Sequence, residues 1–175
     1  VQQICRIDYE KTDAISAPVK EKLKKRISEL MKGHSLVIIQ DYAKGLFDED
    51  LIQFIIAKAH ALSIKVCVDP GKHTPPHFYR GADLIKPNFT EAKIIAQSYG
   101  ERSSDAQKLC TIIREKLQVE TVIMTLGPEG MAILDAKGFR LVPTISTEVY
   151  DVSGAGDTAI SVMSISLAAG ATLDE

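Results

Sequence analysis

Residues 151–158, with the sequence Asp-Val-Ser-Gly-Ala-Gly-Asp-Thr, place small residues between two acids. Gly154, Ala155 and Gly156 allow the backbone to turn tightly and to come close to a ligand. The apolar run 159–169 follows and predicts a buried helix that starts at this turn. The unpaired N–H groups and the positive end of the helix dipole would then point at one spot, which suits a phosphate group.

Asp157 adds a carboxylate beside this predicted anion site. A carboxylate there could take the proton of a hydroxyl group, so the two features together predict phosphoryl transfer to an alcohol. Short glycine motifs also recur by chance, and a turn that merely starts a helix fits the spacing equally well. From spacing alone, both interpretations stay open.

Asn88 and Glu91 form a second candidate cluster, between a short predicted strand at 82–86 and a predicted helix at 92–99. Glu91 could face a metal ion or its water shell. An Asn and a Glu three residues apart also cap a helix without any ligand. The spacing therefore leaves a structural and a functional interpretation open.

Other polar residues follow the ends of predicted strands. Asp41 and Lys44 come after the continuous apolar run 35–40, and Thr125 ends the run 121–125. Ligands of open α/β sheets bind beyond the carboxyl ends of the strands, so these residues are candidates for ligand contact. A structural loop is the alternative for Asp41 and Lys44.

Two further positions are weaker candidates. Arg6 lies on an alternating stretch, 3–10, that predicts a strand; it could reach a polar ligand or simply be solvated. Asp69 ends the predicted strand 64–69, and Lys72 in the loop that follows could bind a phosphate.

Predicted strands and helices alternate four times along the chain, which indicates right-handed crossovers and a parallel sheet with helices on both faces. Further helices are expected at 18–31, at 48–62 after the cap Asp48, and at 104–117 after the cap Ser104, with a hairpin at 131–142. The basic run at 20–26 predicts a solvated helix face. In such a sheet one edge collects Asp41, Asp69, Asn88, Glu91, Thr125 and Asp157.

The hydrophobic content of 45% is that of an ordinary globular protein. A length of 175 residues is enough for one domain with a buried core and too short for two. A formal net charge of −2 gives no support for nucleic-acid or membrane partners. Three widely spaced cysteines, Cys5, Cys67 and Cys110, indicate reduced thiols in a cytoplasmic protein. The first residue is not Met and the last precedes an expected helix, so we expect a piece of a longer chain.

The stretch 151–158 resembles the C-terminal signature of the ribokinase-like (PfkB-type) carbohydrate kinases, except that Val162 stands where a smaller residue is usual. The resemblance implies a three-layer α-β-α fold with a mostly parallel sheet, and ATP and Mg²⁺ as partners in the reaction. It also implies an anion hole and a catalytic base, formed by Gly154, Ala155, Gly156 and Asp157.

Two more motifs carry this resemblance. Asn-x-x-Glu after a strand is associated in the family with magnesium, through water, and with nucleotide phosphates; it implies nucleotide contacts by Asn88, Phe89, Thr90 and Glu91, with Glu91 toward the metal. The Thr-x-Gly-x-x-Gly turn borders ATP in the family, which implies a cofactor role for Thr125, Gly127 and Gly130.

A finer resemblance is to the heptose-7-phosphate kinase domains of bacterial ADP-heptose synthesis proteins. It rests on the stretches 6–10, 41–45, 86–91 and 148–158, whereas 126–128 looks more like generic ribokinases. It implies that the anomeric hydroxyl of D-glycero-D-manno-heptose 7-phosphate is phosphorylated, with substrate contacts by Arg6, Asp41 and Lys44, in a homodimer.

Relative to these kinases, the chain lacks the N-terminal sugar-binding part with its lid, and the last helices. We therefore expect residues 1–175 to be a single domain, the C-terminal catalytic and nucleotide-binding part of a kinase. The alternatives are a kinase for another sugar, a nucleoside or a vitamin alcohol, and an inactive nucleotide-binding or dimerisation module.

Overall fold

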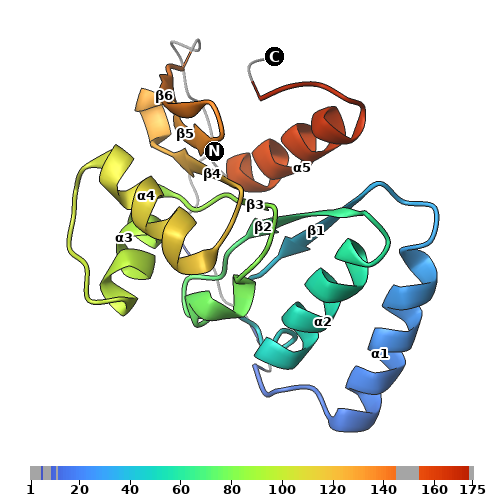
Figure 1. Ribbon diagram of the computed structural model, residues 1–175. Helices are drawn as coiled ribbons and strands as arrows, with labels where there is room; N and C mark the ends of the chain where they lie inside the picture. Colours follow the sequence, from blue (N-terminus) through green and yellow to red (C-terminus); the bar gives the residue numbers. More distant parts are fainter. Residues whose placement is uncertain (1–4, 6–8, 11, 145–153, 174–175) are drawn as a thin grey trace.

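A mixed six-stranded sheet forms the centre of the molecule (Figure 1). The computed structural model describes residues 5, 9–10, 12–144 and 154–173. Spatial order follows chain order: β1 (Leu36–Gln40), β2 (Lys65–Asp69), β3 (Leu84–Ile85), β4 (Thr121–Thr125), β5 (Met131–Asp135) and β6 (Gly138–Val142). The first four strands are parallel; β5 and β6 form the predicted antiparallel hairpin, and β5 also pairs antiparallel with β4.

Helices cover both faces of the sheet, as the alternation of elements predicts. The larger core lies between the sheet and α2 (Glu49–His60), α3 (Phe89–Ser98) and α4 (Ala106–Leu117). Successive side chains of a strand point to opposite faces, so β2 sends Val66 and Val68 to this core and Cys67 to the other. There α5 (Ala155–Ala168) packs through Ile160. The result is the expected three-layer α-β-α arrangement with a mostly parallel sheet (Figure 1).

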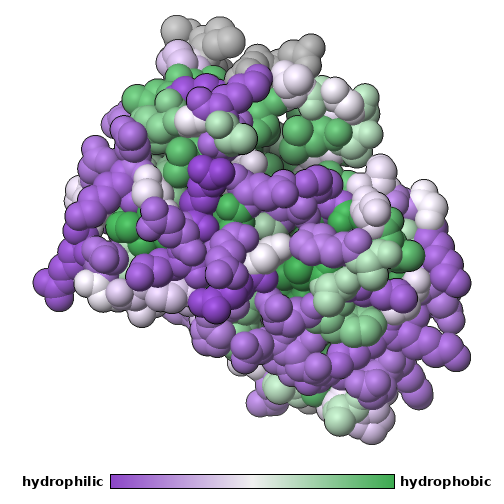
Figure 2. Space-filling view, in the orientation of Figure 1, coloured by the Kyte–Doolittle hydropathy of each residue, from purple (hydrophilic) through white to green (hydrophobic). Residues whose placement is uncertain are grey.

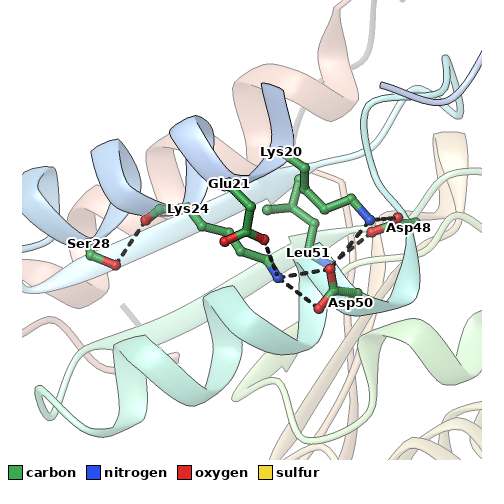
Figure 3. Close-up of polar contacts among 7 residues, drawn as sticks. All are labelled: Lys20, Glu21, Lys24, Ser28, Asp48, Asp50 and Leu51. Carbon is green, nitrogen blue, oxygen red and sulfur yellow. Dashed lines mark hydrogen bonds and ion pairs between the residues drawn. The ribbon is translucent and has the colours of Figure 1, made fainter. Parts of the chain in front are cut away.

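The outermost helix, α1 (Ala17–Leu30), confirms part of the predicted solvated basic face, since Lys22, Lys25 and Arg26 are exposed, but Lys20 and Lys24 correct the rest. The Lys20 ammonium contacts both Asp48 and Asp50 at the start of α2, and Lys24 lies 2.8 Å from Asp50 (Figure 3). Only 17% and 15% of these two lysine side chains is exposed. The unpaired N–H groups at the start of α2 favour acidic residues there. These carboxylates in turn attract the two lysine ammonium groups of α1.

Helix starts differ from the predicted ones where a nearby polar residue makes a better cap. Asp105, not Ser104, caps α4, since its carboxylate accepts the N–H of Lys108 at 2.7 Å. Asp48 caps α2 as predicted, accepting the N–H of Leu51. Helix α3 begins at Phe89, three residues before its predicted start. Most of the strand predicted at 3–10, Arg6 included, lies outside the described residues.

The helix after the glycine motif is not buried all round, contrary to the prediction. Only Ile160 and Ser164 of α5 are buried, whereas Val162 and Ile165 are 57% and 68% exposed. The sheet covers one side of α5, and no described element packs on the other. Figure 2 accordingly shows hydrophobic surface near α5 and the β5–β6 hairpin.

Two of the three thiols are buried, as their apolar neighbours in sequence predict. Cys67 and Cys110 are buried and Cys5 is exposed, and all three are free. Burial raises the pKa of the Cys110 thiol to about 12, so it stays protonated and unreactive near neutral pH. As for membranes, none of the helices in the described ranges is long and apolar enough to cross one.

Gly130 lets the turn after β4 pass against the end of β6. Its φ is +99°, and a Cβ there would lie 2.1 Å from the Val142 carbonyl oxygen. We expect Gly130→Ala to lower the free energy of unfolding by about 3 kcal/mol, because alanine is strained at this φ and its Cβ would collide with the Val142 carbonyl oxygen. Gly138→Ala is the control: its φ is +107°, but no described atom lies within 4 Å of a Cβ. Equal losses for both variants in urea denaturation would mean that the close approach is unimportant.

Candidate active site

A cavity of about 720 Å³ opens at the carboxyl ends of β1 to β4, where α3 and α5 begin. Parallel pairing brings the strand ends to one edge: Gln40 is opposite Asp69, and Asn88 bridges to Thr125. The cavity is lined by Gln40, Asp41, Tyr42, Asp69, Pro70, Lys72, Lys86, Asn88, Phe89, Thr90, Glu91, Thr125, Leu126, Gly127, Gly156 and Asp157.

Helix α5 aims its first turn at this cavity. Gly154 precedes the helix with a φ of +76°, a left-handed conformation that suits glycine. The first intrahelical hydrogen bond runs from the Thr158 N–H to the Gly154 carbonyl, and no described side chain caps this end. The N–H groups of Ala155, Gly156 and Asp157 therefore have no partner inside the helix, and this end can bind an anion.

Asp157 is held by two side chains from the end of β1 and the loop after it. The Gln40 amide donates to Oδ1, and the Tyr42 hydroxyl donates to Oδ2 at 3.0 Å. Asp157 is half-buried and lines the cavity. A carboxylate fixed in this way can accept a proton from a group in the cavity.

Lys86 supplies a buried positive charge beneath the first turn of α5. The side chain is 3% exposed, and Nζ lies 3.1 Å from Asp69 Oδ1. A Cβ at Gly156 would lie 3.6 Å from Nζ, so the lysine sits directly under this bend. Burial raises the pKa of the Asp69 carboxyl, although Lys86 acts to lower it, and the nearby Asp157 raises it further. Lys86 and the open helix end together favour a phosphate.

Asn88 and Glu91 make the capping box that their spacing allows. The Glu91 N–H donates to Asn88 Oδ1 at 2.9 Å, and the Asn88 N–H donates to Glu91 Oε2 at 2.8 Å. Both residues also line the cavity, so capping and ligand contact are compatible. Burial raises the pKa of the Glu91 carboxyl, the bond from Asn88 lowers it and the charge of Asp69 raises it.

The described residues fit a magnesium ion that is held partly by phosphate and water. No group of three or more His, Cys, Asp or Glu in the described part of the chain could hold a metal alone. Mg²⁺ usually takes one or two carboxylates together with substrate phosphates and waters. Glu91, with Asp69 nearby, can supply such carboxylates at the cavity wall.

Asp41, a predicted substrate ligand, has its carboxylate engaged inside the protein. It is 8% exposed and accepts hydrogen bonds from Thr74 Oγ1, the Tyr79 hydroxyl and the Ala43 N–H at 2.6, 2.7 and 2.7 Å. A Cβ at Gly71 would lie 2.9 Å from its Cγ, so the loop after β2 packs directly on it. Asp41 thus fixes two loops at the rim, and a substrate contact by it stays a prediction.

The other predicted site residues divide by position. The cavity lining includes Asn88, Phe89, Thr90, Glu91, Thr125, Gly127, Gly156 and Asp157. Gly154 and Ala155 are exposed beside it. Lys44 pairs with Glu10, and Gly130 packs against the end of β6, so neither lines the cavity.

Sequence reasoning missed three residues of the site. Gln40 and Tyr42 flank Asp41, and the charge of Asp41 makes it the candidate that the sequence predicts at the end of β1. Lys86 comes just before Asn88 and Glu91, and these two residues are the ones whose spacing makes them candidates for ligand contact. Position at the end of a strand was the signal available for all three.

The fold and the site agree with the family to which the chain belongs. Residues 6–175 match the pfkB family of carbohydrate kinases, and the chain is a member of that family. Among solved structures, phosphofructokinase-2 from Escherichia coli superposes with a TM-score of 0.77 at 20% identity, over 91% of this chain and 53% of that one. Ribokinase from Thermotoga maritima gives a TM-score of 0.65 at 18% identity, over 82% and 46%. These likenesses establish a ribokinase-like fold.

The curated relatives are more similar in sequence. The bifunctional protein HldE of a Nitratiruptor species is 34% identical over 174 residues, and that of Vibrio vulnificus (strain YJ016) is 38% identical over 176 residues. Each alignment covers 99% of this chain but 36% of the relative. The chain therefore spans about a third of the length of these relatives.

Proposed function

We propose that residues 1–175 form one domain, the catalytic and nucleotide-binding part of an ATP-dependent sugar kinase. Membership of the carbohydrate kinase family supports the reaction class. The observation that carries the proposal is the meeting of three features in one cavity: the carboxylate of Asp157, the open N-terminus of α5 and the buried ammonium of Lys86.

In the proposed reaction Asp157 takes the proton of the acceptor hydroxyl. The acceptor oxygen bonds to the γ-phosphorus, and the bond from that phosphorus to the bridging oxygen breaks, which releases ADP. The N–H groups at the start of α5 and the Lys86 ammonium stabilise the charge that develops on the phosphoryl oxygens. Most of the rate enhancement would come from this positioning and electrostatics.

Mg²⁺, bound to the nucleotide, would neutralise phosphate charge. Asn88, Glu91, Thr125 and Gly127 lie along the same wall of the cavity, which supports their role in binding nucleotide and metal. Glu91 would hold the ion through water.

Glu91→Gln separates metal binding from helix capping. A glutamine can still accept the Asn88 N–H, so we expect the free energy of unfolding to change by less than about 0.5 kcal/mol. The loss of the charge should raise the Mg²⁺ concentration needed for half-maximal ATP binding by about tenfold or more. Calorimetric titration of ATP at several Mg²⁺ concentrations measures this. Glu91→Ala should lose both properties, and a glutamine variant with unchanged Mg²⁺ dependence would remove Glu91 from the metal site.

The acceptor that we propose is the anomeric hydroxyl of D-glycero-D-manno-heptose 7-phosphate. The sequence identity of 34% and 38% to two HldE proteins, in alignments that cover 99% of the chain, supports this choice. The test is a coupled ADP-release assay of the intact gene product against heptose 7-phosphate, fructose 6-phosphate, ribose and a nucleoside. Preference for the heptose would support the proposal, and preference for another alcohol would replace it with a related kinase. Binding of ATP without transfer to any acceptor would favour a nucleotide-binding module.

We also propose that the kinase is a cytoplasmic homodimer. Buried free thiols at Cys67 and Cys110 are compatible with a reducing compartment. The exposed apolar residues of α5 and β6, Leu141, Val142, Val162 and Ile165, offer a surface for further packing. Light scattering of the purified gene product would give its oligomeric state.

A further inference from the structure

One carboxylate oxygen of Asp157, the proposed base, already accepts a hydrogen bond from a side chain of the protein. The Tyr42 hydroxyl donates a hydrogen bond to Asp157 Oδ2 at 3.0 Å. An acceptor alcohol about to lose its proton would have to donate the same kind of O–H hydrogen bond to this carboxylate, at a similar distance. The phenol oxygen of Tyr42 therefore lies at one of the positions from which a hydroxyl group can donate to Asp157.

The two residues that hold Asp157 differ in their freedom to move. Gln40 belongs to β1, is partly buried and is fixed by pairing with β2. Tyr42 lies beyond the strand and is 61% exposed. The preceding residue, Asp41, fixes the backbone at this point, because its carboxylate accepts three hydrogen bonds. The Tyr42 ring can therefore leave Asp157 without a movement of the strand or the loop.

We propose that Tyr42 is a gate on the base: without an acceptor its hydroxyl occupies Asp157, and the acceptor hydroxyl displaces it. This inference rests on the proposed role of Asp157 as the base. The exchange replaces one O–H donor on the carboxylate by another, so it changes the number of hydrogen bonds little. The pKa of the Tyr42 phenol is raised by the same bond to Asp157, so the gate keeps its proton and remains a donor.

A gate of this kind would suppress wasteful hydrolysis of ATP. In the absence of sugar, a water molecule at Asp157 could give its proton to the carboxylate while its oxygen bonds to the γ-phosphorus and the bond to ADP breaks. The products would be ADP and inorganic phosphate. With the phenol in place, one acceptor position of Asp157 Oδ2 is closed to water, and part of the binding free energy of the sugar is used to displace the phenol.

The test compares Tyr42→Phe with Tyr9→Phe in the intact gene product. Tyr9 is 98% exposed and does not line the cavity, so it controls for loss of a hydroxyl. We expect Tyr42→Phe to raise sugar-independent phosphate release by about tenfold, the effect of losing one hydrogen bond to a charged group. The KM of the acceptor should fall several-fold while kcat changes little, and Tyr9→Phe should match the wild type.

Other outcomes would overturn the gate. A fall in kcat with unchanged sugar-independent hydrolysis would mean that Tyr42 only positions the base. Kinetics indistinguishable from those of the Tyr9 variant would mean that the contact has no role. The double variant Tyr42→Phe/Asp157→Asn must lose the extra hydrolysis if the gate acts through Asp157. Should Asp157→Asn alone leave sugar phosphorylation intact, the proposed function fails, which is distinguishable from failure of the gate.

Discussion

Asp157→Asn is expected to lower kcat for sugar phosphorylation by about 10³-fold in the intact gene product, the usual contribution of a general base. An asparagine has nearly the same shape but cannot take the proton of the acceptor. Affinity for ATP should change little, because the N–H groups at the start of α5 and the Lys86 ammonium remain. Steady-state kinetics with the acceptor, together with calorimetric titration of ATP, separate the two effects.

The matched control is Asp105→Asn. Asp105 caps α4, does not line the cavity, and can be replaced as a cap by asparagine at little cost. Its kcat should stay at the wild-type value. If Asp157→Asn retained more than about a tenth of wild-type kcat, Asp157 could not be the general base.

Lys86→Met is expected to have the second large effect, on both stability and catalysis. The substitution leaves Asp69 in a mostly buried position without its cation, and breaking a buried pair in this way costs about 3–5 kcal/mol. It also removes the positive charge under Gly156 that would balance the transferred phosphoryl group. Urea denaturation measures the first effect, and kcat with saturating substrates measures the second.

A double variant tells these two effects apart. Lys86→Met/Asp69→Asn also removes the negative charge of Asp69, which the single variant leaves buried without a cation. It should therefore recover much of the lost stability. The kcat should remain low, because no ammonium group is restored beneath α5. Recovery of kcat together with stability would mean that Lys86 serves the fold alone.

The position of the site could be predicted from the sequence because strand ends in a parallel sheet meet at one edge. The apolar runs that became β1, β2 and β4 fixed where Asp41, Asp69 and Thr125 would lie. The structure brings these residues together with Glu91 and Asp157 around one cavity. Their individual roles in binding and catalysis remain predictions.

The parts that could not be predicted depend on contacts between distant residues. Lysine is rarely buried, so nothing in the residues around Lys86 indicates that its ammonium pairs with Asp69 beneath another helix. Tyr42 is separated from Asp157 by more than a hundred positions, and only the packing of α5 beside β1 joins them. The apolar run of α5 predicted a buried helix, yet one face of it has no packing partner among the described residues.

The most direct measurement is a crystal structure of the intact gene product with a non-hydrolysable ATP analogue, Mg²⁺ and the acceptor sugar. It should place the terminal phosphate against the N–H groups of Gly156 and Asp157. The acceptor hydroxyl should lie about 3 Å from the Asp157 carboxylate, with the Tyr42 hydroxyl moved away. A triphosphate bound outside this cavity, or an acceptor hydroxyl out of reach of Asp157, would contradict the proposed site of phosphoryl transfer.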